Sequence, residues 1–265
     1  MWVGADPPSW GPMRLLILVC LSLSLVAAVP DWVTDLRGEV MVDLAAGALP
    51  LRHEICAISV VSTYDPAAGR MTGTLRAAIV NDGTDAWPSV GFALHANNTA
   101  SYQGTSIAID AAMVGGVAVT ADLVDDGRGV ILPLAEPLAP GAWVECSLTF
   151  TTVVPVGGGR AGLLARDESA HSLYSWLPEP AVRSADGWTF AAITTMSDPC
   201  WVRCADYRWD LSLPEGWTLV ASGHEAETAP GSWRVLAPRT RNLVAWVSDQ
   251  EAQTLALTGQ GPLVR

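Results

Sequence analysis

The sequence predicts an all-β protein, an antiparallel β-sandwich or saddle-like domain preceded by a hydrophobic signal helix. From Ile55 onward, short apolar or alternating runs are separated by turn residues about every ten positions, which is typical of sandwiches and barrels. In the stretch 204–213, Tyr207, Trp209 and Leu211 alternate with charged or polar residues. A period of two places one face of a strand in the core and the other in water.

The N-terminal region is predicted to be a secretory signal peptide covering residues 1–28. Met13-Arg14 precedes an apolar run from Leu15 to Val29, and the run contains small residues at Val26-Ala27-Ala28, where a signal peptidase would cut. Met13 is an alternative start. The run is shorter than the roughly 20 residues that span a bilayer, so an uncleaved membrane anchor is the alternative. We therefore expect a secreted or cell-envelope protein.

The rest of the chain divides into a lead-in segment at 29–52, which is expected to be either irregular or a short helix, a β domain at 53–250 and a tail at 251–265. Turns such as Asn81-Asp82-Gly83 and Asp125-Asp126-Gly127 supply the positive φ angles that hairpins need. The region 156–172 is expected to be one long loop. The expected strands are Ile55–Thr63, Met71–Val80, Ser89–Ala96, Ser106–Asp110, Val117–Leu123, Gly129–Pro133, Trp143–Val153, Trp188–Thr194, Cys204–Leu213, Trp217–Ala221, Ser232–Leu236 and Asn242–Val247.

Composition excludes several classes of function. The formal net charge is −12, which disfavours binding to nucleic acid or anionic lipid. The chain has no lysine, so Schiff-base catalysis through lysine is excluded. With Cys20 in the signal, the remaining cysteines allow three disulfide pairings, and Cys200 could bridge Cys204 only if the chain bends, because an extended strand separates them by roughly 13 Å. These cysteines are Cys56, Cys146, Cys200 and Cys204.

Motifs for catalysis are weak. Neither His53-Glu54 nor His224-Glu225 completes the His-Glu-x-x-His pattern that binds zinc from a helix. Ser169, His171 and Asp167 are close in sequence, but a polar loop explains them better than a catalytic triad. The twelve tryptophans could line a sugar- or peptide-binding surface, although core packing is the preferred interpretation for most of them.

Several motifs in a shared order carry a resemblance to a known family. The motifs are Leu138-Ala139-Pro140-Gly141, Ser175-Trp176-Leu177-Pro178, Asp198-Pro199, Ala205-Asp206-Tyr207, Pro214-Glu215-Gly216 and Val220-Ala221-Ser222-Gly223. In this order they resemble the N-terminal β domain of the aminopeptidase N-like family of zinc metallopeptidases, over about Ile55 to Ser248. The family's zinc motif and its Gly-x-Met-Glu-Asn strand have no counterpart in this sequence.

The resemblance implies a non-catalytic domain that packs against a catalytic metallopeptidase domain, in cis or in trans, and helps to shape the pocket for the N-terminus of a peptide. We therefore expect no catalytic residue, metal ligand or cofactor in this chain, with zinc only in the catalytic domain that would follow the tail. The positions expected to face a peptide are Tyr174, Trp176, Pro178, Cys200 and Trp201. The alternative is a stand-alone envelope module that binds peptide, protein or glycan; a membrane contact is expected only if the signal is uncleaved.

Overall fold

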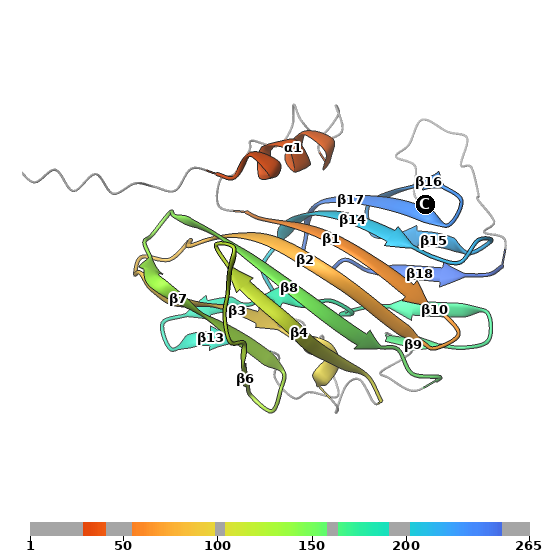
Figure 1. Ribbon diagram of the computed structural model, residues 1–265, viewed down its shortest axis with the longest axis horizontal. Coiled ribbons are helices and arrows are strands. Elements are labelled where there is room, and N and C mark those ends of the chain that lie inside the picture. Colours follow the sequence, from red (N-terminus) through yellow and green to blue (C-terminus); the bar gives the residue numbers. More distant parts are fainter. Residues whose placement is uncertain (1–28, 41–54, 99–103, 158–163, 191–201, 251–265) are drawn as a thin grey trace, which may run out of the picture.

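The computed structural model describes residues 29–40, 55–98, 104–157, 164–190 and 202–250 (Figure 1). These residues form three β-sheets, a short β-hairpin, one α-helix and one turn of 3-10 helix. The expected signal peptide, the tail 251–265, Cys200 and Trp201 lie outside the described residues.

The largest sheet has eight strands and runs across the whole view in Figure 1. In spatial order its strands are β16 (His224–Ala229), β17 (Ser232–Thr240), β14 (Ala205–Ser212), β1 (Cys56–Asp65), β2 (Arg70–Val80), β8 (Trp143–Val153), β4 (Ser106–Val114) and β5 (Val117–Ala118).

Two four-stranded sheets cover the inner face of the large sheet. The second sheet has the order β15 (Thr218–Ala221), β18 (Ala245–Ser248), β10 (Ala170–Leu173) and β9 (Leu164–Arg166). The third has the order β11 (Glu179–Pro180), β3 (Trp87–Ala93), β7 (Gly129–Leu138) and β6 (Asp122–Val124), and the hairpin consists of β12 (Val182–Ser184) and β13 (Gly187–Thr189). One hydrophobic core contains side chains from all three sheets, which makes the described β domain a single packed unit.

The all-β prediction is confirmed for the described residues, and β2 and β8 match the expected strands closely. The structure corrects three details. Strand β1 pairs with β14 in parallel, so the large sheet is mixed and not purely antiparallel. The expected strand Val117–Leu123 is two short strands in different sheets, β5 and β6. The expected long loop at 156–172 contains β9 and β10, whose short runs gave little periodic signal.

Helix α1 (Asp31–Val40) lies on the outer face of the large sheet (Figure 1). Its apolar side is buried: Val33 packs in a small cluster with Ala57, Ala78 and Trp143. Asp31 in the first turn and Arg37 in the last turn have the signs that the helix dipole favours. The short helix expected in the lead-in segment is therefore present.

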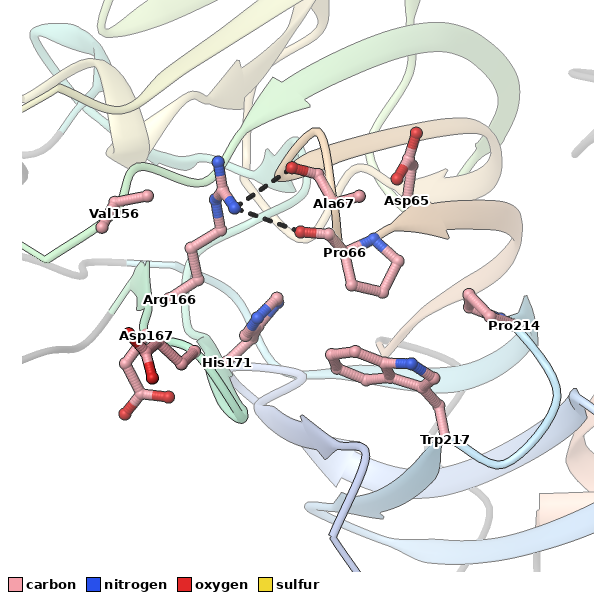
Figure 2. Close-up of a pocket in the computed structure, with 10 residues that line it drawn as sticks. Asp65, Pro66, Ala67, Val156, Arg166, Asp167, His171, Pro214 and Trp217 are labelled. Atoms are coloured by element: carbon pink, nitrogen blue, oxygen red, sulfur yellow. Dashed lines mark hydrogen bonds between the residues drawn. The ribbon is translucent and has the colours of Figure 1, made fainter.

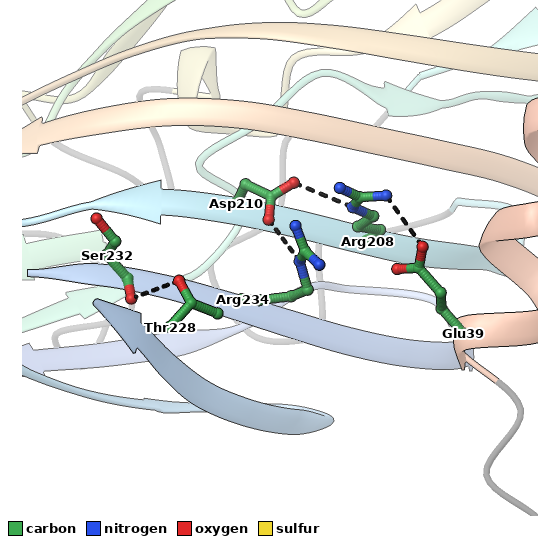
Figure 3. A network of polar contacts seen from close by, with 6 residues as sticks. All are labelled: Glu39, Arg208, Asp210, Thr228, Ser232 and Arg234. Atoms are coloured by element: carbon green, nitrogen blue, oxygen red, sulfur yellow. Dashed lines mark hydrogen bonds and ion pairs between the residues drawn. The ribbon is translucent and has the colours of Figure 1, made fainter.

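Ion pairs fasten α1 to the sheet. Arg37 Nε lies 3.1 Å from Asp206 Oδ2, and only 8% and 7% of these two side chains is exposed. Arg37 also donates a hydrogen bond to the carbonyl of Ile55. Figure 3 shows the more exposed continuation, in which Arg208 bridges Glu39 of the helix and Asp210 of β14. Removing one partner of a buried ion pair such as Arg37–Asp206 lowers stability strongly, because the other charge stays buried without a partner. More exposed pairs such as Arg208–Glu39 contribute little to stability.

Two cysteines are free and buried in the large sheet, Cys56 on β1 and Cys146 on β8. Strand β2 lies between β1 and β8, so the two thiols are on strands that do not neighbour each other. Burial raises the pKa of both thiols, and that of Cys146 rises to about 12. Cys204 is exposed, and its possible partner Cys200 lies outside the described residues, so that pairing stays a prediction.

Among the described residues, none of the helices has the length and apolar character of a membrane span.

Replacing Arg37 by methionine should lower the free energy of unfolding by about 3 kcal/mol, because Asp206 would keep a buried charge without its cation. Urea denaturation followed by tryptophan fluorescence measures the change. Arg70→Met is the matched control, since Arg70 is exposed at the start of β2, and it should change stability by less than about 0.5 kcal/mol. Equal stability of the two variants would show that the buried pair does not hold the helix.

The buried thiols give a second prediction. In native protein at pH 8, Cys56 and Cys146 should not react with a disulfide reagent such as Ellman's, because burial hinders access and the raised pKa values keep both thiols protonated. Both should react once the protein is unfolded in guanidinium. The control is a Cys56→Ala, Cys146→Ala double variant, in which the two thiols that become reactive on unfolding should be missing. Rapid labelling of either cysteine in the native wild-type protein would contradict the described burial.

Candidate functional site

The segment 174–180, expected to face a peptide, runs from β10 to β11 and lies mostly in the core. Trp176 has no exposed surface, and its ring lies 4.5 Å from that of Trp209, centroid to centroid. Its Nε1 donates to the carbonyl of Leu243, and its own carbonyl accepts from Thr152. Trp176 therefore packs in the core of this structure, and its contact with a peptide stays a prediction.

The other positions expected to face a peptide differ in their burial or lie outside the described residues. Pro178 is buried, whereas Tyr174 is half-buried and packs against the edge of the core. Cys200 and Trp201 lie outside the described residues. The peptide-facing role stays a prediction for all five expected positions.

The described residues contain no cluster of three or more His, Cys, Asp or Glu side chains that could hold a metal ion. His224, from the incomplete zinc pattern, is exposed at the start of the edge strand β16. His53 lies outside the described residues.

Asp167, Ser169 and His171 do not form a catalytic triad. Asp167 Oδ1 accepts hydrogen bonds from the backbone N–H groups of Ser169 and Ala170, and these bonds lower the pKa of its carboxyl. His171 Nδ1 lies 2.8 Å from the hydroxyl of Tyr64. The histidine is therefore held by the Tyr64 hydroxyl and by a hydrogen bond to the backbone of Asp167, and not by the Asp167 carboxylate.

The clearest surface feature is the outer side of the second sheet. Strand pairing places Val220, Trp246, Ser172 and Ala165 side by side in one row across all four strands. Thr218, Ser248 and Ala170 form the adjacent row. We call these seven residues the uncharged face, since it presents no ionisable side chain although the whole chain carries a net charge of −12.

Two side chains dominate the uncharged face. Trp246 is 59% exposed and Val220 is 53% exposed, and the two are cross-strand partners. Their sequence neighbours Ala245, Val247 and Leu219 point into the core. The sequence pattern placed Trp246 in a strand and favoured a packing role for it; the strand is confirmed, but the pattern did not indicate which side of the strand meets solvent.

Comparison with known proteins gives matches in structure only. No protein-family model matches the sequence, and no curated protein matches it. The M1 zinc metallopeptidase from Deinococcus radiodurans is 14% identical, with a TM-score of 0.47, and the alignment covers 74% of this chain and 41% of that one. A two-domain M1 zinc metallopeptidase mutant, E323A, bound to L-tryptophan is 15% identical, with a TM-score of 0.48 and coverage of 74% and 42%.

A third match is the leukotriene A4 hydrolase from Saccharomyces cerevisiae, at 9% identity and a TM-score of 0.43, covering 78% of this chain and 33% of that one. The chain thus spans less than half the length of each of these structures. At such identities the likeness is one of fold alone. The first two structures are zinc metallopeptidases of the M1 type, the kind of protein that the ordered sequence motifs resemble.

Proposed function

We propose that this chain is a non-catalytic β domain that docks on a catalytic zinc metallopeptidase domain, in cis or in trans, through the uncharged face. The observation that carries the proposal is the composition of that face: a row of four residues across four strands and an adjacent row of three across three strands, none of the seven charged, with a tryptophan among them that is 59% exposed. The cores of protein interfaces are depleted in charged residues and enriched in aromatic ones. The resemblance of the ordered motifs supplies the identity of the partner.

The location of the face suits a partner in the same chain. β18, which carries Trp246, is the last strand of the described residues. A domain that continued the chain after Ser248 would therefore start beside the uncharged face. The outer face of the large sheet is a weaker candidate, because α1 covers part of it and charged residues such as Arg208 and Asp210 extend across it (Figure 3).

In this role the chain contributes shape and not chemistry. Docking would bring the second sheet, with the half-buried Tyr174 at the end of β10, against the partner. The family resemblance assigns Cys200 and Trp201 to the peptide-facing side, and these two positions would contribute to the pocket for the substrate's N-terminus. Export through the N-terminal segment would place the complex outside the cytoplasm.

Docking is tested by mixing the purified chain with a separately expressed domain that carries His-Glu-x-x-His, encoded in the same or a neighbouring reading frame. We expect binding by isothermal calorimetry and a loss of affinity of at least tenfold in Trp246→Ser, as for an interface hot spot. Val61→Ser is the matched control, because Val61 is 60% exposed on the opposite, large sheet, and it should bind like the wild type.

The same preparation tests the non-catalytic role. Alone, the chain should hold no stoichiometric zinc and hydrolyse no aminoacyl-anilide, since both require the partner's zinc motif. Turnover by the chain alone would refute the proposal. Unchanged affinity of Trp246→Ser would show that docking, if it occurs, uses another face.

A further inference from the structure

A hollow of about 480 Å³ lies at one end of the sandwich, between the β14–β15 turn and the β16–β17 turn. We call it the aromatic hollow, because Trp217 and Trp233 both line it. Its volume is within the range of small-molecule sites. Among its lining residues only Thr218 also belongs to the uncharged face, so the two surfaces adjoin without coinciding.

Hydrogen bonds tie together the two turns that frame the aromatic hollow. The N–H of Leu213 donates to the carbonyl of Gly231 at 2.8 Å. Gly231 has φ +70°, and a Cβ there would lie 2.5 Å from the Leu213 carbonyl oxygen, so glycine is needed for this close approach. The N–H of Gly231 donates to Glu227 Oε1, and Thr228 Oγ1 donates to the carbonyl of Ser232 (Figure 3). The fold therefore forms this hollow without help from a ligand.

The two indoles are held in place by the fold. Trp233 on β17 is half-buried, packs against the core and is the cross-strand partner of Glu227 on β16. Trp217 is also half-buried, and its ring lies beside that of His171, with centroids 5.0 Å apart (Figure 2). Each indole thus presents an ordered aromatic surface to the hollow.

The charge of the aromatic hollow is negative. Glu215 and Glu227 are its only ionisable lining residues, and both are exposed. Within the described residues Glu215 takes part in no hydrogen bond or ion pair, and Glu227 uses only Oε1. The lining contains no arginine or histidine. Two carboxylates therefore lie beside two indoles without a cation of this chain among the lining residues.

The other side of Trp217 adds to this negative charge. A neighbouring hollow of about 400 Å³, drawn in Figure 2, is lined by Asp65, Asp167 and Glu168 together with Arg166. The Arg166 guanidinium donates to three backbone carbonyls of nearby turns, which fixes it in the wall. Because three carboxylates outnumber this single cation, the electrostatic potential around Trp217 attracts positive charge.

We propose that the aromatic hollow binds the basic side chain, arginine or lysine, of a peptide. The aliphatic stem of such a side chain packs on indole, and its charged group is attracted to the ring face. Its N–H groups can donate to Glu215 and to Oε2 of Glu227, and such charge-assisted hydrogen bonds are strong. An anionic ligand would be repelled, and a neutral one would leave both carboxylates without a counter-charge.

The test is calorimetry and tryptophan fluorescence on the whole chain with the capped tripeptides Gly-Arg-Gly and Gly-Lys-Gly, up to about 20 mM, which covers the millimolar affinity of a weak site. The control is the same tripeptide with citrulline, which has nearly the shape of arginine but no charge. We expect at least one basic peptide to bind at least tenfold more tightly than the citrulline peptide. Binding should weaken between about 10 mM and 150 mM salt, because salt screens charges.

Two results of these titrations overturn the proposal. The first is the absence of saturable binding by both basic peptides, or equal binding of the citrulline peptide. The second is tighter binding of tetramethylammonium, a cation without N–H donors, which would assign the hollow to a free quaternary ammonium ion. No arm contains a docking partner, so the result is independent of docking through the uncharged face.

Variants locate the site. Glu215→Gln should weaken the bound basic peptide about threefold with unchanged urea stability, because Glu215 is exposed and has no contact to lose. Glu136→Gln is the matched control: it removes the same charge from an exposed position on β7 of the third sheet, and it should bind like the wild type. Trp217→Leu, which removes the aromatic surface, should also weaken binding. Equal affinities of Glu215→Gln and Glu136→Gln would place the peptide elsewhere and refute the assignment.

Discussion

The contact between the tilted rings of Trp176 and Trp209 is the one on which the rest of the structure depends. Trp209 belongs to β14 in the middle of the large sheet, and its Nε1 donates to Ser62 of the neighbouring β1. Trp176 lies in the link that leaves the second sheet, and its Nε1 donates to the carbonyl of Leu243, two residues before β18. One pair of rings thus ties two sheets together and fixes where the last strand begins.

That position determines which side of β18 meets solvent. Since side chains alternate along a strand, Ala245 and Val247 face the core and Trp246 must face outward. The same sheet therefore serves two surfaces. Its inner row contains Val247 and His171, and His171 lies beside Trp217. Its outer row contains Trp246 and Ser172.

The sequence predicted the β class and the long strands because their periodic signal is strong, as in β2, β8 and β14. It could not predict β9 or β11, which are only a few residues long and exist because neighbouring strands complete them. The parallel pairing of β1 with β14 was also beyond reach, since nearly 150 residues separate the two strands and local patterns do not encode register over such loops.

Tryptophans show the same limit at the level of single side chains. Trp176, Trp217 and Trp246 all lie in short apolar runs, yet one is fully buried, one lines a hollow and one lies on the surface. A short apolar run shows that a side chain meets some apolar partner, but not whether that partner belongs to the same fold. For Trp176 the partner is Trp209. For Trp246 no described residue covers the ring, and a 59% exposed indole surrounded by uncharged residues has the composition expected of an interface and not of an ordinary acidic surface.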